Sequence, residues 1–252
     1  MLKLDGKVAL VTGCGTRGEG WGNGKAIAVL LARQGATIFG VDLDLEAAQV
    51  TQKIIENEGG KAFVTTANVT HADDVQKMVS TCLEKFGRID ILINSAGGFN
   101  QFLPITDISD EEWDKVVALN LRSTFSCCRA VIPFMTEQHY GRIINIASLL
   151  SFQGGINVPA YTASKHAVAG VTKALANEWG AKGVTVNAIA PGYISTDNTQ
   201  ALRNDVDRNA SILARIPIGR WGTPEDLAAV AVFLASPAAS YINGEIITVD
   251  GG

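Results

Sequence analysis

A tyrosine and a lysine four residues apart are the side chains of this sequence best suited to move a proton. Tyr161 and Lys165 lie in the segment YTASK, and on a helix this spacing places both on one face, where the ammonium can reach the phenol. Bringing a tyrosine pKa from ~10 to about neutrality takes roughly 4 kcal/mol, which nearby positive charge can supply. Tyr161 is therefore a candidate acid/base for exchanging an alcohol and a ketone, although the spacing alone is also common in surface pairs.

A glycine-rich segment offers a site for phosphate groups. Six glycines fall between Gly13 and Gly24, directly after a β-branched run and directly before a helical pattern. Such a turn lets the backbone approach a pyrophosphate, whose charge a helix N-terminus favours. Asp42 ends the next β-branched run, where a carboxylate can accept hydrogen bonds from the hydroxyls of a ribose. The pattern predicts a dinucleotide site, and a turn without a ligand is the alternative.

Short β-branched runs alternate with longer amphipathic segments. The runs are nearly continuous in apolar residues, as strands covered on both faces require, and most of the intervening segments have helical length. The predicted strands are 7–12, 37–42, 61–69, 89–94, 142–148, 184–190 and 245–250, and the predicted helices are 26–35, 73–86, 111–139, 161–181 and 224–235. The alternation predicts an α/β fold with a doubly wound, parallel, seven-stranded sheet and helices on both faces.

One segment departs from this alternation. Residues 193–222 carry mixed charge and little strand pattern, between the sixth predicted strand and the last helix. Ligands of open α/β sheets bind beyond the carboxyl ends of the strands, where Ser148 also lies, so this segment is a candidate substrate lid. No composition shift, linker or repeat divides the chain, which predicts a single domain over residues 1–252.

Composition argues against several kinds of partner. The chain has 21 basic and 25 acidic side chains, a formal net charge of -4 and no basic cluster longer than two neighbours, which disfavours nucleic acid and anionic membranes. Its longest helix-like apolar stretch, Leu227 to Ala235, is far shorter than the ~20 residues that span a bilayer, and no signal segment is expected. Four cysteines without metal-binding spacing favour reduced thiols in a cytoplasmic protein that holds no metal.

These residues and several further motifs together resemble the short-chain dehydrogenase/reductase family along essentially the whole chain. The shared motifs are the turn opened by Thr12-Gly13, Asn94-Ser95-Ala96-Gly97, Asn120, Ser148, Tyr161-x-x-x-Lys165, Pro191-Gly192 and Asp250-Gly251-Gly252. The resemblance implies a Rossmann-like single domain, a homotetramer and a catalytic tetrad. In that tetrad Tyr161 exchanges the proton, Ser148 bonds the substrate oxygen, Lys165 binds the nicotinamide ribose and lowers the Tyr161 pKa, and Asn120 holds a relay water.

The resemblance also implies which residues hold a nicotinamide dinucleotide. The expected contacts are Gly13, Gly22, Asn23, Gly24, Asp42, Asn68, Val69, Asn94, Ala96, Gly97, Tyr161, Lys165, Pro191, Gly192, Ile194 and Thr196. Asp42 favours NAD, because its carboxylate would repel the 2′-phosphate of NADP. Arg17 favours NADP, but it falls among about five residues that this turn has in excess of the family pattern. We therefore predict NAD, with NADP possible through Arg17.

The second half of the chain resembles a narrower group. Segments such as 151–155 and 190–222 are similar to those of 2-deoxy-D-gluconate 3-dehydrogenases and, next, of gluconate 5-dehydrogenases. The resemblance implies a sugar-acid substrate near Ser148, Gln153 and Tyr161. Arg215 or Arg220 could grip its carboxylate, whereas Arg203 falls in a stretch typical of a solvated helix face. A 3-oxoacyl thioester or general carbonyl reductase is the alternative, and a non-catalytic nucleotide sensor is the alternative of a different class.

Overall fold

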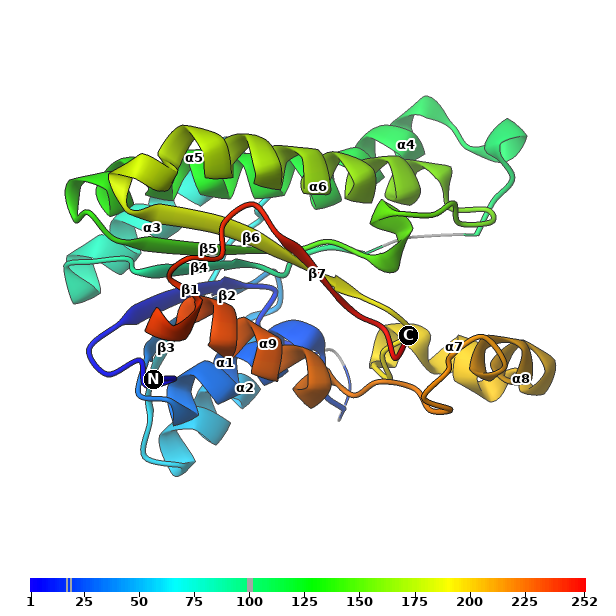
Figure 1. Cartoon of the computed structure of the whole chain (residues 1–252), viewed down its shortest axis with the longest axis horizontal. Coiled ribbons are helices and arrows are strands. Elements are labelled where there is room, and N and C mark those ends of the chain that lie inside the picture. The colour runs from blue at the N-terminus through cyan, green and yellow to red at the C-terminus, as the bar shows by residue number, and fades with distance from the viewer. Residues whose placement is uncertain (17, 19, 99–101) are drawn as a thin grey trace.

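Seven short strands form one parallel sheet, as the alternating pattern predicts (Figure 1). The structure is a computed structural model and describes all residues except 17, 19 and 99–101. The strands are β1 (Val8–Thr12), β2 (Thr37–Asp42), β3 (Lys61–Thr66), β4 (Ile91–Asn94), β5 (Gly141–Ile146), β6 (Val184–Pro191) and β7 (Ile246–Val249). Their order is β3-β2-β1-β4-β5-β6-β7. Successive strands are thus added on one side of β1 up to β3 and on its other side from β4 onward. Ligands of open α/β sheets bind at this switch point, between β1 and β4.

Helices cover both faces of the sheet (Figure 1). On one face lie α1 (Asn23–Arg33), α2 (Leu45–Asn57) and α9 (Pro224–Ala235), and on the other lie α3 (Ala72–Phe86), α4 (Asp110–Val117), α5 (Ser123–Glu137) and α6 (Pro159–Trp179). Successive side chains of a strand point to opposite faces. In β4, Ile91 and Ile93 accordingly pack with α1 and α9, whereas Leu92 packs with α3 and α5. The near-continuous apolar runs therefore contribute side chains to the hydrophobic cores on both faces of the sheet.

The polar strand ends meet at one edge of the sheet. Thr12 pairs with Asn94 across β1 and β4, and Asn94 pairs with Asn145 across β4 and β5. All strands are parallel, so the glycine-rich turn after β1, Ser148 after β5 and Gly192 after β6 leave the sheet on the same side. This edge is where the candidate catalytic and dinucleotide residues converge.

Several elements differ from those predicted. The third strand ends at Thr66 rather than at residue 69, because the Asn68 side-chain oxygen accepts a hydrogen bond of 3.0 Å from the Thr70 amide and turns the chain. The helix expected over 111–139 is α4 and α5 joined by a π-helical turn, η2 (Ala118–Arg122). Helix α2 was not among the predicted ranges, although the Asp44 carboxylate caps it by accepting from the Ala47 amide at 3.2 Å.

Residues 193–222 contain short helices that the sequence pattern did not predict. These are η5 (Asp197–Thr199), α7 (Gln200–Asn204) and α8 (Val206–Leu213). Other short 3-10 turns are η1 (Ile105–Asp107), η3 (Leu149–Ser151), η4 (Gly180–Lys182) and η6 (Pro237–Ala239). A backbone hydrogen bond of 2.8 Å from Ser195 to Gly222 closes the base of the segment. Among the helices that the structure describes, none has the length and apolarity that crossing a membrane requires.

Candidate active site

The tyrosine and lysine of the YTASK segment lie in the first turns of α6. Pro159 starts this helix, where its missing N–H has no helical partner to lose. Lys165 is 4% exposed, its Nζ donates a hydrogen bond of 2.7 Å to the Ile146 carbonyl, and it lies 5.5 Å from the centroid of the Tyr161 ring. Burial lowers the pKa of Lys165 to about 8. The helix therefore brings an ammonium group that is largely excluded from solvent close to the ring of Tyr161.

Ser148 completes the proton-bearing cluster. It follows the carboxyl end of β5 and is buried, and its Oγ accepts a hydrogen bond of 3.1 Å from the Leu150 amide at the start of η3. Burial raises the pKa of Tyr161, and its hydrogen bond with Ser148 lowers the pKa in part. The net direction is upward, opposite to the lowering that the resemblance implies, because in the protein alone desolvation of the phenolate outweighs the neighbouring donors.

Asn120 lies in the π-helical turn η2, fully buried. Its Oδ1 accepts from the Gly98 amide at 3.0 Å, and its Nδ2 donates to the carbonyls of Gly98 at 2.7 Å and Val116 at 2.9 Å. A Cβ on Gly97 would lie 2.9 Å from Asn120 Oδ1 and 3.5 Å from Lys165 Nζ. Gly97 thus allows Asn120 and Lys165 to approach the same short stretch of backbone.

The glycine-rich turn forms a tight junction between β1 and α1. Gly13 has a φ of 68°, which favours glycine, and a Cβ on Gly24 would overlap the Gly13 carbonyl. Gly22 is the N-cap residue of α1, with no side-chain cap, and the first turn of this helix carries no acidic residue. Its N-terminal amides and positive dipole end thus remain suited to an anion, and the turn fits the diphosphate of a dinucleotide.

Two side chains from other elements and one from within the turn brace it. Asp42 Oδ2 accepts from the Gly15 amide at 2.8 Å, Thr16 Oγ1 accepts from the Gly22 amide at 2.9 Å, and Asp197 Oδ2 accepts from the Gly18 amide at 3.1 Å. The bracing roles of Thr16 and Asp197 were not predicted from the sequence, because Thr16 lies in a turn longer than the family pattern and Asp197 is 179 positions from Gly18. Arg17, the residue expected to favour NADP, lies outside the described residues.

A buried lysine, also missing from the predicted site, lies beside the same turn. Lys25 is 4% exposed, and its Nζ donates a hydrogen bond of 3.1 Å to the Gly20 carbonyl. Burial lowers the pKa of Lys25, and the charge of Asp197 partly opposes this shift. The start of α1 therefore holds a desolvated positive charge in addition to its dipole.

The residues expected on the adenine side follow β3 and β4. The carbonyl oxygen of the Asn68 side chain accepts from the Thr70 amide and hydroxyl, and Val69 is buried. Asn94 Nδ2 donates to Asn145 Oδ1 at 2.9 Å, so this side chain braces β4 against β5. The Ala96 amide donates to Thr12 Oγ1 at 3.2 Å, which holds the backbone after β4 against the end of β1.

The residues expected on the nicotinamide side follow β6. Pro191 ends this strand, and the Gly192 amide donates to the Val249 carbonyl at 2.9 Å. Ile194 is buried and bridges to Gly222, and Thr196 forms a capping box with Thr199. Gln153, expected near the substrate, is exposed in the loop after η3. The structure thus places the four candidate tetrad residues and both groups of expected cofactor contacts at the carboxyl edge of the sheet.

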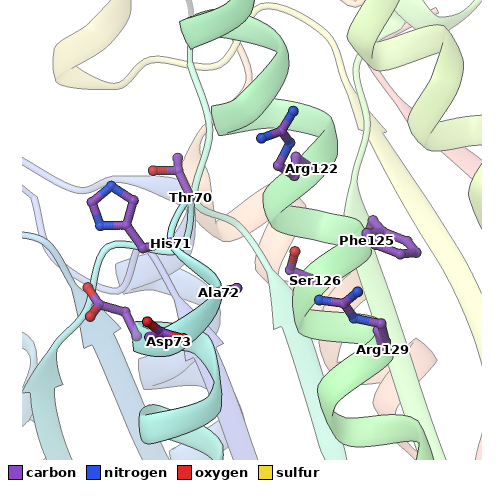
Figure 2. A pocket seen from close by; sticks show the side chains of 9 residues that line it. Thr70, His71, Ala72, Asp73, Arg122, Phe125, Ser126 and Arg129 are labelled. Carbon is purple, nitrogen blue, oxygen red and sulfur yellow. The ribbon is translucent and has the colours of Figure 1, made fainter.

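A separate pocket lies between the start of α3 and α5 (Figure 2). Its lining includes His71, Asp73, Arg122, Phe125 and Arg129. None of the four tetrad residues lines it. Within the described residues, no cluster of His, Cys, Asp or Glu could hold a metal ion.

Comparisons with known proteins agree with this geometry. A family model described as enoyl-(acyl carrier protein) reductase matches residues 19–252. The 2-dehydro-3-deoxy-D-gluconate 5-dehydrogenase of Dickeya dadantii is 48% identical over 253 residues, covering 100% of this chain and 96% of the relative. The enzyme of the same name from Bacillus subtilis is 49% identical over 251 residues, with the same coverage.

A solved structure is similar over the whole fold. It is that of a proposed 2-deoxy-D-gluconate 3-dehydrogenase from Agrobacterium tumefaciens with bound NADP, with a TM-score of 0.91, 46% identity and coverage of 100% of this chain and 97% of that one. The sequence motifs suggested this likeness for the second half only, whereas the comparisons extend it over the whole chain. The chain therefore belongs to the short-chain dehydrogenase/reductase family of NAD(P)-dependent oxidoreductases.

Proposed function

We propose that this protein interconverts a secondary alcohol and a ketone on a sugar acid of the 2-keto-3-deoxygluconate class. The observation that carries the proposal is the convergence of Ser148, Tyr161 and Lys165 at the sheet edge, one of them a lysine with its pKa lowered to about 8 by burial. The two relatives named for 2-dehydro-3-deoxy-D-gluconate support the substrate class. Binding alone requires no such constellation, which disfavours a nucleotide sensor.

The tetrad side chains take complementary roles in this proposal. In the oxidation direction, Ser148 holds the substrate oxygen while Tyr161 takes the hydroxyl proton. The nicotinamide, when bound, would supply the acceptor for the hydride from the same carbon. Lys165 holds the nicotinamide ribose, and its charge favours the tyrosinate. Asn120, fixed by Gly98 and Val116, positions a water that passes the proton onward. Reduction of the ketone reverses each transfer.

NAD is the proposed cofactor. The Asp42 carboxylate lies at the end of β2 and already binds the Gly15 amide, so its position is fixed by the turn. A 2′-phosphate beside this carboxylate would meet like charge, which costs affinity for NADP. The related structure from Agrobacterium tumefaciens has bound NADP, so the kcat/KM values of this protein for NAD and for NADP should be measured side by side.

A spectrophotometric panel tests the reaction class and the substrate. The absorbance of reduced nicotinamide is followed with sugar acids, polyols, simple ketones and acetoacetyl thioesters, with NAD and NADP in turn. We expect the keto-deoxy sugar acid or its alcohol to have the highest kcat/KM. A thioester that exceeds it by more than tenfold would instead establish an acyl-thioester reductase, and tight dinucleotide binding without turnover of any compound would establish a sensor.

The proposal includes the way the chain is organised. Residues 1–252 act as one catalytic domain, and residues 193–222 act as a lid over the substrate. Limited proteolysis tests the lid: cleavage within 193–222 should slow when NADH and the sugar acid are both present. Equal cleavage rates with and without ligands would contradict it.

A homotetramer in the cytoplasm completes the proposal. Phe125, Phe134 and Trp113, on α5 and α4, are 46%, 37% and 37% exposed, which suits contact between subunits. The cysteines are free and buried, and burial raises the pKa of Cys14 and Cys82 to about 12, consistent with a reducing compartment. Light scattering that reports a stable 26.6 kDa monomer would contradict the tetramer, and cell fractionation tests the location.

A further inference from the structure

The lid segment carries four arginines in unequal surroundings. Arg220 forms two hydrogen bonds with the Asp226 carboxylate, at 2.7 and 3.1 Å, so the fork suggested for an acidic substrate is already occupied. The Arg208 guanidinium lies 5.7 Å from the centroid of the Phe102 ring, and Arg215 is exposed. Arg203, expected on a solvated helix face, is instead partly buried.

The Arg203 guanidinium is only partly satisfied. From α7 its Nη2 donates a hydrogen bond of 2.9 Å to the Thr196 carbonyl. Its Nε is buried and has no hydrogen-bond partner, and no salt bridge to Arg203 occurs among the described residues. Buried donors in native proteins are almost always bonded, and one on a permanent cation calls for an anionic acceptor.

The position of this guanidinium is fixed by the lid base. Thr199 Oγ1 donates to the Ile194 carbonyl at 2.7 Å, and Ile194 bridges to Gly222. Thr196, which holds Arg203, is two residues beyond Ile194 and five beyond the end of β6 at Pro191. Arg203 is therefore anchored to the base of a segment that begins just beyond the carboxyl end of β6 and is closed by the Ile194–Gly222 bridge.

We propose that Arg203 binds the carboxylate of the acidic substrate and thereby selects sugar acids over neutral polyols. The inference rests on the proposed function, which supplies a substrate with one carboxylate. A guanidinium presents parallel N–H donors that match both oxygens of a carboxylate. The phosphates of the cofactor have other donors, namely the amides at the start of α1 and the buried ammonium of Lys25.

The test compares the sugar acid with its methyl ester, which keeps the hydroxyls and loses the charge. In Arg203→Met we expect KM for the acid to rise roughly 10- to 100-fold, the range of a lost charged hydrogen bond, with KM for the ester changed less than threefold. Arg203→Lys should lie between, because an ammonium keeps the charge and loses the fork. Added guanidinium should restore acid turnover in Arg203→Ala. Arg33→Met, which removes an exposed arginine far from the lid, is the matched control.

Each contrary result has a distinct meaning. Equal losses for acid and ester would mean that Arg203 only supports the lid, and would overturn the inference. A higher dissociation constant for NADH in Arg203→Met, measured by fluorescence titration, would show that a cofactor phosphate is the partner of Arg203. A rise in KM confined to Arg215→Met would move the role to that residue. Failure of the wild-type protein on every sugar acid would reject the proposed function itself, whereas wild-type turnover with an unchanged Arg203→Met rejects this inference alone.

Discussion

The carboxylate of Asp197 accepts a hydrogen bond of 3.1 Å from the backbone amide of Gly18, which lies 179 positions earlier in the chain. A Cβ on Gly18 or on Gly20 would lie 2.5 Å from an oxygen of the same carboxylate, so side chains at these positions would displace it. This contact joins the base of the proposed lid, residues 193–222, to the turn proposed to receive the dinucleotide phosphates. Cofactor binding and lid position are expected to be coupled through it.

Loss of the Asp197 contact should weaken the hold on the cofactor. We expect Asp197→Ala to speed NADH dissociation several-fold, measured by stopped-flow fluorescence, and to speed amide hydrogen exchange at Gly18. Asp197→Asn retains an acceptor oxygen and should stay close to the wild type in both measurements. Equal effects of the two variants would mean that the charge, rather than the hydrogen bond, is what matters.

Tyr161→Phe keeps the ring and removes the proton carrier. Turnover should fall at least ~10²-fold, the scale of general acid–base catalysis, while the dissociation constant for NADH stays nearly unchanged. Tyr241 is fully exposed, and Tyr241→Phe serves as the matched control. Near-normal turnover in Tyr161→Phe would remove this residue from the mechanism.

Lys165→Met should change both cofactor affinity and the pH profile. Burial raises the pKa of Tyr161, and without the ammonium the hydrogen bond with Ser148 opposes this shift with no help from Lys165, so the acidic limb of the oxidation profile should move to higher pH. In the wild type, the pKa of Lys165 is about 8, so NADH affinity should decline as pH rises through this value and the ammonium loses its proton. The variant should show no such step, and identical pH profiles would place the control of Tyr161 elsewhere.

Asp42→Ala should shift the balance between the two cofactors. The kcat/KM for NAD should fall, because the ribose hydroxyls lose an acceptor, and that for NADP should rise, because a like charge is removed. Glu46→Ala removes a charge from an exposed position just beyond the same strand and is the control. No change with either cofactor would mean that Asp42 only braces the Gly15 amide.

The Arg220–Asp226 pair should contribute to stability only above acidic pH. Hydrogen bonds from Arg220 and from the Thr223 amide lower the pKa of Asp226 from 3.8 to about 2. This stabilisation is complete above pH 3.8 and is lost as pH falls towards 2. Arg220 is half exposed, so Arg220→Met should cost about 1 kcal/mol or less near neutral pH and nothing near pH 2 in urea unfolding. A difference that persists near pH 2 would point to lost packing.

The centre of the sheet was predictable because strands β1, β4, β5 and β6 are buried on both faces. Each of these strands leaves a nearly uninterrupted apolar run, and a doubly wound parallel sheet follows from the alternation with helices. The convergence of the candidate tetrad residues was predictable because Tyr161 and Lys165 share one helix face and Ser148 lies just beyond the carboxyl end of β5. In these cases the local pattern and the tertiary position carry the same information.

Other parts depend on contacts that no local pattern contains. Asp197 approaches Gly18 only because β6 and β1 end at the same edge, and the burial of Lys25 depends on a turn longer than the family pattern. Among the arginines of residues 193–222, Arg220 is paired by Asp226, whereas Arg203 has a buried Nε without a hydrogen-bond partner. Tertiary pairing, rather than residue type, decides these roles.

The π-helical turn between α4 and α5 makes the number of residues in this segment as important to the candidate site as their chemical types. A turn of five residues winds one residue more than an α-helical turn, so everything after it is rotated by about 100° from where an uninterrupted helix would place it. Deleting one residue from 118–122 would restore a regular helix, yet it would either turn Asn120 away from Gly98 or turn the apolar face of α5 away from the sheet. Variants that change the length of this turn are therefore expected to be selected against even where every chemical group is retained.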